Sequence, residues 1–184
     1  NVFNLNTKRA YVEEDGVIEW VTGSFGSKVS MLYPMGILAG ARSRMEYTGV
    51  SFAGEGQVLD TGAKVVHLAE DTYSMINAKS LSSGGGVSMT RTLAKITKKA
   101  LRARSYTDCK SLILDNRSVS NAIPEVKVEC NEAEVSHEAS VGKISDEAVY
   151  YLQTRGVSED EARALIVRGF TGDVSKELPI EYAM

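Results

Sequence analysis

Two residues with reactive side chains, His137 and Glu138, are neighbours in the run EAEVSHEASVGKIS (132–145). A histidine and a carboxylate in contact can act together as a general acid/base pair. Alternation of apolar and polar residues predicts a strand here, in which His137 shares a face with Ala133 and Val135 while Glu138 points the other way. The pattern therefore favours a core histidine and a solvated glutamate over a catalytic pair.

A cysteine is the next candidate. Cys109 stands between Asp108 and Lys110 in the run YTDCKSLIL (106–114). A neighbouring lysine lowers the pKa of a thiol, so this triplet could make an activated nucleophile. A buried, inert cysteine fits the run equally well, because free cysteine packs as a small hydrophobe.

The second cysteine, Cys130, follows the run IPEVKVE and shares its parity with Val126 and Val128. A strand here would point all three side chains inward, which predicts a buried thiol. Cys109 and Cys130 do not have the C-x-x-C spacing of a zinc or redox site, and two cysteines are too few for a disulfide scaffold. We therefore expect reduced thiols.

The glycine-rich run SSGGGVSMTR (82–91) offers consecutive backbone N–H groups, which can bind an anion. It lacks the lysine and hydroxyl spacing of a P-loop, and no clear helix follows it. Because glycine tolerates positive φ, we expect a structural turn instead. The chain shows no serine–histidine–aspartate order and no H-E-x-x-H motif, so nothing in it points to a hydrolase.

Composition narrows the class of protein. The chain has 184 residues, of which 43% are hydrophobic and 24% charged, and its net charge is -3. A negative protein attracts no phosphate backbone, so we expect no nucleic-acid partner. No apolar window is long enough to span a bilayer and no signal peptide is present, which predicts a cytoplasmic protein without a membrane partner. The abrupt ends suggest a piece of a longer protein.

Two kinds of pattern divide the chain. Twelve of the 16 glycines lie in residues 16–86, between short runs in which apolar and polar residues alternate. That pattern predicts strands, and no amphipathic helix appears before Ser145 to connect them as in an ordinary α/β sheet. A sandwich, a barrel or a β-helix remains open. The run TLAKITKKALRA (92–103) fits a helix or a strand, and we assign it to a strand.

Helix signals begin at Ser145. The run SDEAVYYLQTRG (145–156) has Ser145 as N-cap and Gly156 where a left-handed C-terminal cap belongs. The run SEDEARALIVRG (158–169) repeats the device, with Ser158 and Glu161 spaced as a capping box and with Gly169 as the stop. These signals predict a helical hairpin after the β-rich body.

Several motifs together resemble a known family. They are GSKVSMLYP, SFAGEGQVLDTGAKVVH, SLSSGGG and the long run SHEASVGKISDEAVYYLQTRGVSEDEARALIVRGF. These segments are similar to the SufB/SufD family of the SUF iron–sulfur cluster assembly system, and the resemblance covers essentially the whole chain. It corresponds to the C-terminal part of that family, less than half of the full protein. Glu138 favours the SufB branch, since SufD usually has glycine after the histidine.

The resemblance implies a mainly β fold, with a right-handed parallel β-helix core over residues 1–143 and a helical region over 144–184. It implies a non-enzymatic scaffold that holds a transient iron–sulfur cluster at an interface with a SufD-like paralogue or a second SufB copy. Residues 145–178 would dock the SufC ATPase, with Ile166 and Phe170 in the contact. A sulfur donor system would supply sulfur, and whether a flavin takes part stays open.

The resemblance also assigns site residues. Glu138 falls on the glutamate implicated as a cluster ligand, and His137 is its neighbour in the motif. Cys109 sits in a C-x-S-L run where the family often has a cysteine, which makes it the sulfur-handling candidate. A further cysteine of the family falls on Ser118, and serine is a poor substitute for a thiolate. The implied iron ligands are therefore Glu138, Cys109 and groups from a partner.

Other functions stay open beside the scaffold. One is a purely structural, SufD-like adaptor that couples SufC to a partner and holds no cluster. Another is a carbohydrate-active β-helix enzyme, but Glu138 has no second carboxylate at hydrolytic spacing. We also expect self-association through the open rung at the start of the chain, since an open strand edge invites pairing.

Overall fold

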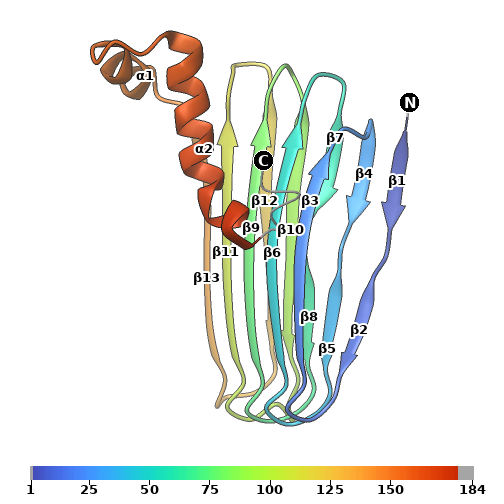
Figure 1. Cartoon of the computed structure of the whole chain (residues 1–184). Coiled ribbons are helices and arrows are strands. Elements are labelled where there is room, and N and C mark those ends of the chain that lie inside the picture. The colour runs from blue at the N-terminus through green and yellow to red at the C-terminus, as the bar shows by residue number, and fades with distance from the viewer. Residues whose placement is uncertain (1, 178–184) are drawn as a thin grey trace.

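Strands fill the chain as far as Lys143 in a computed structural model that describes residues 2–177. They form two parallel sheets, and the chain passes from one sheet to the other and back (Figure 1). The five-stranded sheet contains, in spatial order, β3 Val17–Phe25, β6 Arg44–Ala53, β9 Tyr73–Ser82, β11 Arg104–Ile113 and β13 Glu134–Lys143. The eight-stranded sheet contains β1 Phe3–Asn6, β2 Arg9–Val12, β4 Val29–Leu32, β5 Met35–Leu38, β7 Val58–Thr61, β8 Lys64–His67, β10 Val87–Ile96 and β12 Val119–Val128.

Each turn of the chain contributes to both sheets. Strands β4 and β5 lie end to end, as do β7 and β8, and β10 pairs along its length with both β7 and β8. The result is a parallel β-solenoid of about five turns followed by two helices. The predicted fold class is confirmed, and of the three β architectures that the alternation left open the structure has the β-helix.

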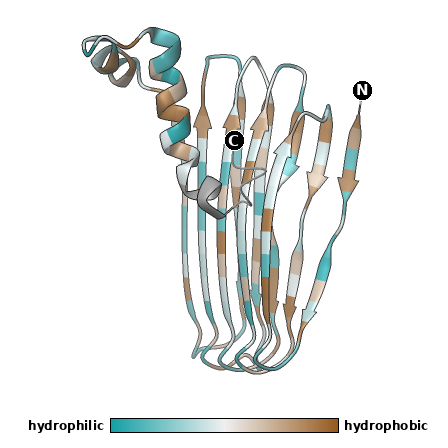
Figure 2. Ribbon diagram, in the orientation of Figure 1, coloured by the Kyte–Doolittle hydropathy of each residue, from teal (hydrophilic) through white to brown (hydrophobic). Residues whose placement is uncertain are grey.

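The register between neighbouring strands arranges residues in columns. Tyr47, Ile76, Thr107 and His137 are successive partners across β6, β9, β11 and β13. Side chains alternate between the two faces of a strand, so every member of a column faces the same way. The buried Tyr47 and Ile76 show that this column faces the space between the sheets. Figure 2 shows the corresponding alternation of hydropathy along the strands.

The interior combines apolar and hydroxyl side chains. Leu38, Met45 and Ile76 are fully buried in the main apolar cluster. Serines of neighbouring turns pair within the same interior, and the Oγ atoms of Ser80 and Ser111 lie 2.7 Å apart. Because buried polar groups are costly unless they are hydrogen-bonded, such pairs let small hydroxyl residues fill the narrow space between the sheets.

The glycine-rich run forms a turn, as predicted. Gly84 and Gly85 have φ values of 65° and 87°, and they connect β9 to β10. Their N–H groups donate to side chains of the next turn, Gly84 to Asp115 Oδ2 at 2.5 Å and Gly85 to Ser118 Oγ at 3.0 Å. The backbone donors that could have held an anion are therefore used within the protein.

The run 92–103 is only partly a strand. β10 ends at Ile96, and the chain then turns through residues 97–103 before β11 begins at Arg104. Arg102 lies in this turn with φ 56°, a conformation that no strand residue adopts. The strand prediction is therefore right for residues 92–96 and wrong for the rest, because apolar Ala100 and Ala103 are buried within a turn.

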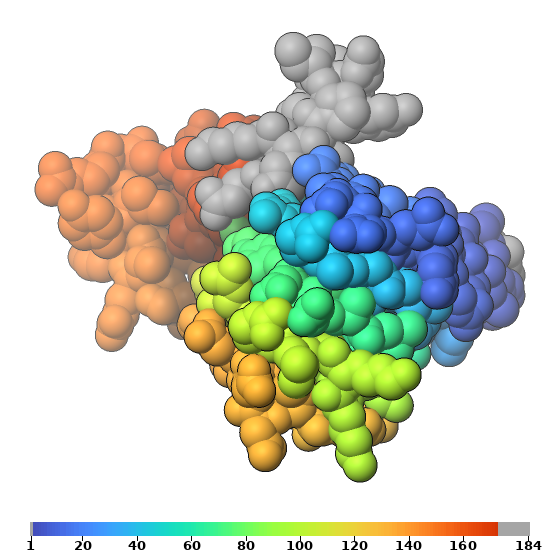
Figure 3. Space-filling view, turned by 90° about the horizontal axis from the view of Figure 1, so that it is seen from below, coloured from blue at the N-terminus to red at the C-terminus, as the bar shows by residue number. Residues whose placement is uncertain are grey.

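Opposite charges alternate along the edge where the chain turns into the five-stranded sheet. Arg42 Nε lies 2.7 Å from Asp15 Oδ1, and two turns further along the solenoid Arg102 Nη2 lies 2.7 Å from Asp71 Oδ2. All four residues have positive φ, and the arginine hydrogen bonds lower the pKa of both aspartates. Figure 3 looks at this end of the molecule, where successive turns lie side by side in chain order.

Two helices follow the last strand, α1 Asp146–Gln153 and α2 Glu159–Glu177. Ser145 caps α1 by accepting a hydrogen bond from the N–H of Ala148, as predicted, and Gly156 has the expected positive φ of 87°. The prediction that the second helix stops at Gly169 is wrong, since α2 continues to Glu177. Packing of neighbouring residues against the body outweighs the low helix propensity of glycine.

Apolar residues of α2 contact the body of the solenoid. Ile166 packs against a buried cluster that contains Ile144 and Val149, and Phe170 packs with Val50 and Leu81. These contacts anchor α2 to the outer face of the five-stranded sheet. Both partly buried side chains therefore have partners within the chain, and the prediction that Ile166 and Phe170 form a docking contact stays a prediction.

A buried histidine completes the interior. His67 is fully buried at the end of β8, with Nδ1 2.8 Å from Thr72 Oγ1 and Nε2 2.9 Å from Ser74 Oγ. Burial penalises the charged imidazolium and lowers its pKa from 6.5 to about 4. The unfolded chain therefore takes up this proton at a higher pH than the folded chain does.

We predict that the free energy of unfolding falls as the pH decreases from about 6.5 to about 4, by about 3 kcal/mol from His67 alone. Urea unfolding at several pH values measures this slope. His67→Gln keeps hydrogen-bonding capacity without a titrating ring. Between pH 6.5 and pH 4 the free energy of unfolding of this variant should therefore fall by about 3 kcal/mol less than that of the parent. Identical slopes for the variant and the parent would contradict the assignment.

Candidate functional site

The two residues of the starting motif lie on β13, an edge strand of the five-stranded sheet. His137 belongs to the interior column and Glu138 faces outward, so the prediction that they point to opposite faces is confirmed. The prediction that His137 is a core residue is wrong, since its side chain is exposed. No further turn of the described chain covers the interior face of β13.

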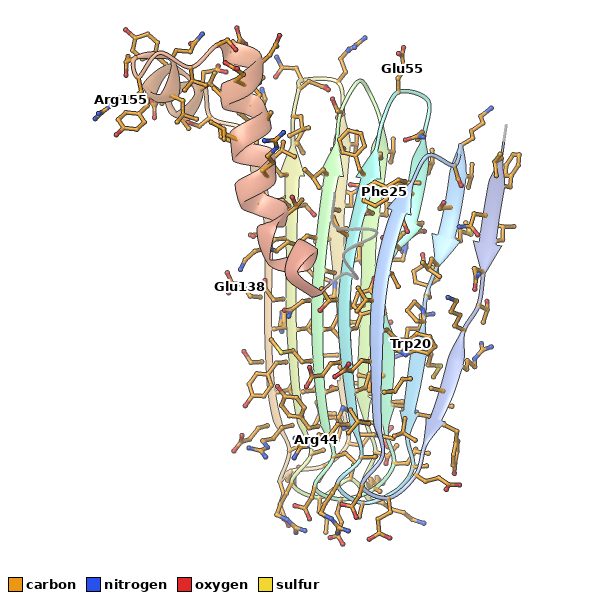
Figure 4. All side chains as sticks on the ribbon, in the orientation of Figure 1. Trp20, Phe25, Arg44, Glu55, Glu138 and Arg155 are labelled. Carbon is orange, nitrogen blue, oxygen red and sulfur yellow. The ribbon has the colours of Figure 1, made fainter. Side chains whose placement is uncertain are left out.

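Glu138 stands on the outer face of the five-stranded sheet. Figure 4 shows it at the edge of the body formed by β13. Its register partner on β11 is Asp108, and both line a hollow of about 170 Å³ together with Asn77 and Ser136. The side chains around this hollow offer oxygen atoms as possible metal ligands, and none of them is a thiol.

Cys109 lies on the other face of the same sheet. Its register partners are Ala78 and Ala139, and its side chain is fully buried within the solenoid. Burial raises the pKa of the thiol, against a weaker opposing effect of the Thr92 hydroxyl, whose Oγ1 is 3.9 Å from Sγ. The structure therefore favours the inert thiol over the activated one.

Lys110 cannot activate this thiol from its position. It faces outward, where its Nζ lies 2.7 Å from Asp108 Oδ2. Neighbours in the sequence point to opposite faces of a strand, so the Asp108–Cys109–Lys110 triplet places both charges on the outer face and the sulfur inside. The same alternation separates Cys109 from Glu138, and the described chain does not bring these two predicted ligands together.

Cys130 is buried, as predicted, in a small cluster with Ile96, Ala100 and Ala103. Val126 and Val128 have the expected interior parity, but 37% and 45% of their side chains are exposed. The prediction that they are buried is wrong for the same reason as for His137. Strand β12 belongs to the last turn, and the described residues do not cover it.

Ser118, the residue that the resemblance aligns with a cysteine, forms part of a turn. Its Oγ donates to Asp115 Oδ2 at 2.9 Å and accepts from the Gly85 N–H, and its backbone N–H donates to Asp115 Oδ1. Hydrogen bonds from the Arg117 and Ser118 N–H groups and from the Ser118 hydroxyl lower the pKa of Asp115 to about 2. This serine supports the turn between β11 and β12 and has no spare donor.

Among the side chains that the structure describes, residues 2–172, no group of three or more histidine, cysteine, aspartate or glutamate residues could hold a metal ion. The available ligands are instead distributed along the edge of the body, with Glu138 and His137 exposed on β13 and both thiols enclosed. Such an arrangement can contribute ligands to a site that a second molecule completes. It does not form a closed metal site of its own.

Sequence reasoning missed the feature that decides exposure, which is the position of β13 at the end of the solenoid. A signal existed in the repeating turns, because the left-handed residues Asp15, Arg42, Asp71 and Arg102 recur at intervals of roughly thirty residues. Counting these repeats would have placed His137 in the last turn. Alternation alone gives the face of a residue but not whether another layer covers that face.

Fold and site together define a parallel β-solenoid protein whose candidate ligands lie at an exposed strand edge. Residues 1–170 match the family described as SUF system FeS cluster assembly, SufBD core domain, and the chain belongs to this family. The family part of the predicted resemblance is thereby confirmed, and the assignment to the SufB branch stays a prediction.

Curated relatives carry the same family description. Iron-sulfur cluster assembly SufBD family proteins of Staphylococcus aureus (strain USA300), Staphylococcus haemolyticus and Staphylococcus epidermidis are each 46% identical to this chain over 184 residues. The alignment covers 100% of this chain and 40% of each relative. No helix within residues 2–177 is long and apolar enough to cross a membrane.

We predict that neither thiol of the native protein reacts readily with a chromogenic aromatic disulfide. Burial of Cys109 and Cys130 and the raised pKa of Cys109 should slow the reaction about a hundredfold relative to a free thiol. Two thiols per chain should react at once in denaturant. Lys110→Ala should leave the native rate unchanged, whereas a slower reaction in this variant would restore the activated-thiol interpretation.

Proposed function

We propose that this protein is a scaffold that shares a nascent iron–sulfur cluster with a second subunit across the β13 edge. The observation that carries the proposal is the exposure of Glu138 and His137 on an edge strand while both cysteines are buried. The chain belongs to an iron–sulfur cluster assembly family, and for this reason we propose a cluster as the ligand of this edge. The cluster is the cargo of the protein, and the protein itself performs no catalysis.

The ligand types suit a cargo site. Iron–sulfur clusters are held mainly by thiolates, and an oxygen or nitrogen ligand in place of one thiolate binds iron less tightly. Glu138 can supply such a ligand on the outer face, and a partner must then supply thiolates, since Cys109 faces the interior and His137 has the same parity as Cys109. A SufD-like paralogue is the partner that we propose, with sulfur from a donor system. A site divided in this way releases its cluster when the subunits separate.

An adaptor without a cluster is the second candidate. It is favoured by the burial of Cys109 and by the serine at position 118, whose hydroxyl is already hydrogen-bonded within a turn. In this function the β13 edge would bind the paralogue for structural reasons only. The iron content of Glu138 variants distinguishes the two candidates.

We predict that Glu138→Gln lowers the iron bound after anaerobic reconstitution with iron and sulfide by about half or more, because one anionic ligand is lost. The protein should be copurified with its SufD-like paralogue, so that the divided site is complete. Iron and sulfide per chain are measured together with the melting temperature, which should hardly change because Glu138 is exposed.

Two variants complete that experiment. Glu132→Gln removes another exposed carboxylate near β13 and should retain full iron. Cys109→Ser should also retain iron, because the sulfur faces away from the β13 edge. Full iron in Glu138→Gln, with the two subunits still associated, would establish the adaptor as the better description.

The helical end supports a second part of the proposal, which is docking of the SufC ATPase. Tyr150, Tyr151 and Leu165 leave large apolar surfaces exposed on α1 and α2. A hollow of about 410 Å³ lies beside Leu165, lined also by Val157 and neighbouring residues. Exposed aromatic and aliphatic residues around a hollow are typical of protein interfaces.

Free cysteines suit a reducing compartment, and we propose that the complex works in the cytoplasm.

We predict that Leu165→Asp lowers the affinity for purified SufC about tenfold or more in a pull-down titration, since it places a charge in the proposed contact. Leu165 has 46% of its side chain exposed, so the helices should stay folded by circular dichroism. Leu68→Asp is the matched control, because Leu68 is 37% exposed on a turn far from the helices. Unchanged SufC binding by Leu165→Asp would disprove the docking surface.

A further inference from the structure

The outer face of the five-stranded sheet carries a band of residues that neither helix covers. Its columns are Glu19, Glu46, Met75, Tyr106 and Ser136, and beside them Val21, Thr48, Asn77, Asp108 and Glu138. The clusters in which α2 packs contain residues further along the same strands, among them Val50, Leu81 and Leu112. The band therefore begins where the helical cover ends.

Two hollows lie in this band. The first, of about 360 Å³, is lined by Glu19, Trp20 and Glu46 together with Val21 and Thr48. The second is the hollow of about 170 Å³ around Asp108 and Glu138 described above. Glu46 of the first hollow is the register partner of Met75 in the second, so the two are continuous along the columns.

The band has acidic ends and an apolar middle. Glu19 and Glu46 lie at one end and Glu138 at the other, and no ion pair joins any of these three to the described residues. Between them Met75 and Tyr106 are exposed over 36% and 39% of their side chains. Unpaired carboxylates that flank an exposed methionine and tyrosine are complementary to cations on either side of an apolar group.

We propose that this band binds an extended segment of a partner protein in which two basic residues flank an apolar one. Five parallel strands span about 19 Å, which matches about six extended residues laid across them. The segment 178–184 of this chain is a poor occupant on charge grounds, since it contains Glu181 and no basic residue. The band shares Glu138 with the proposed cluster site, so the test alters Glu19 and Glu46, which are far from β13 in the sheet order.

The test uses the fluorescein-labelled peptide Lys-Thr-Leu-Tyr-Thr-Lys and the same peptide with glutamate in place of both lysines. Fluorescence anisotropy gives the affinity for the 184-residue chain. Trp20, the single tryptophan, packs against the interior cluster, so its emission should stay unchanged on binding and verifies that the fold is intact. We expect binding of the lysine peptide and none of the glutamate peptide.

Matched charge variants separate a specific site from general attraction. Glu19→Gln/Glu46→Gln should weaken binding of the lysine peptide at least about fivefold. The control Glu55→Gln/Glu132→Gln has the same net charge and alters exposed carboxylates outside the band. Glu55 lies on a turn at the upper end of the strands in Figure 4. This control should change the affinity less than about twofold.

Three results would overturn the proposal. They are the absence of binding, equal weakening in both double variants, and binding that appears only after residues 178–184 are removed. The last result would identify the chain's own terminal segment as the occupant. All variants replace exposed carboxylates with amides of the same shape, so a melting temperature close to that of the parent verifies that each is folded.

Discussion

In-register pairing of parallel strands is the constraint on which the rest of this structure depends. Each strand of the five-stranded sheet pairs with its neighbour without an offset between successive turns, so one residue position per turn defines a column across the sheet. Alternation then divides these columns into an interior set and an exterior set. A shift by one residue would exchange the two sets, which is why the interior tolerates little change of register.

The turns maintain this register. Gly62 divides β7 from β8 with φ 146°, and a Cβ atom there would lie 1.8 Å from the carbonyl oxygen of Arg91 in the next turn. Gly84 and Gly85 pair with side chains of the next turn, and the alternating arginine and aspartate pairs connect successive turns along the opposite edge. Exposed ion pairs contribute little each, so their value lies in fixing the alignment of neighbouring turns.

Local signals in the sequence predicted the local structure well. The caps at Ser145 and Gly156, the glycine turn after β9, and the parity of His137 and Glu138 all follow from the chemistry of a few neighbouring residues. The exposure of His137 and Val128, by contrast, depends on whether another turn lies above them. Likewise Gly169 stays helical because of contacts that α2 makes with distant strands. Such properties come from the number and order of turns, which alternation within a single strand does not encode.

The candidate site follows from the same constraint. Cys109 and Glu138 seemed compatible as ligands of one cluster, but they belong to opposite faces of the sheet. A thiolate for a cluster bound at Glu138 must therefore come from outside the chain. In the function that we propose, the cluster lies at the edge of β13, where a second subunit would complete its ligands, and the solenoid interior serves as structural support.

A disulfide-mapping measurement tests this division of faces most directly. Ala139→Cys and Glu138→Cys are made separately, each variant is oxidised mildly, and non-reduced proteolytic fragments are analysed by mass spectrometry. Ala139 is the register partner of Cys109, and adjacent strands bring paired Cα atoms within disulfide range. The account predicts a bond to Cys109 in Ala139→Cys and none in Glu138→Cys. A bond between Cys109 and the new thiol at position 138 would contradict it.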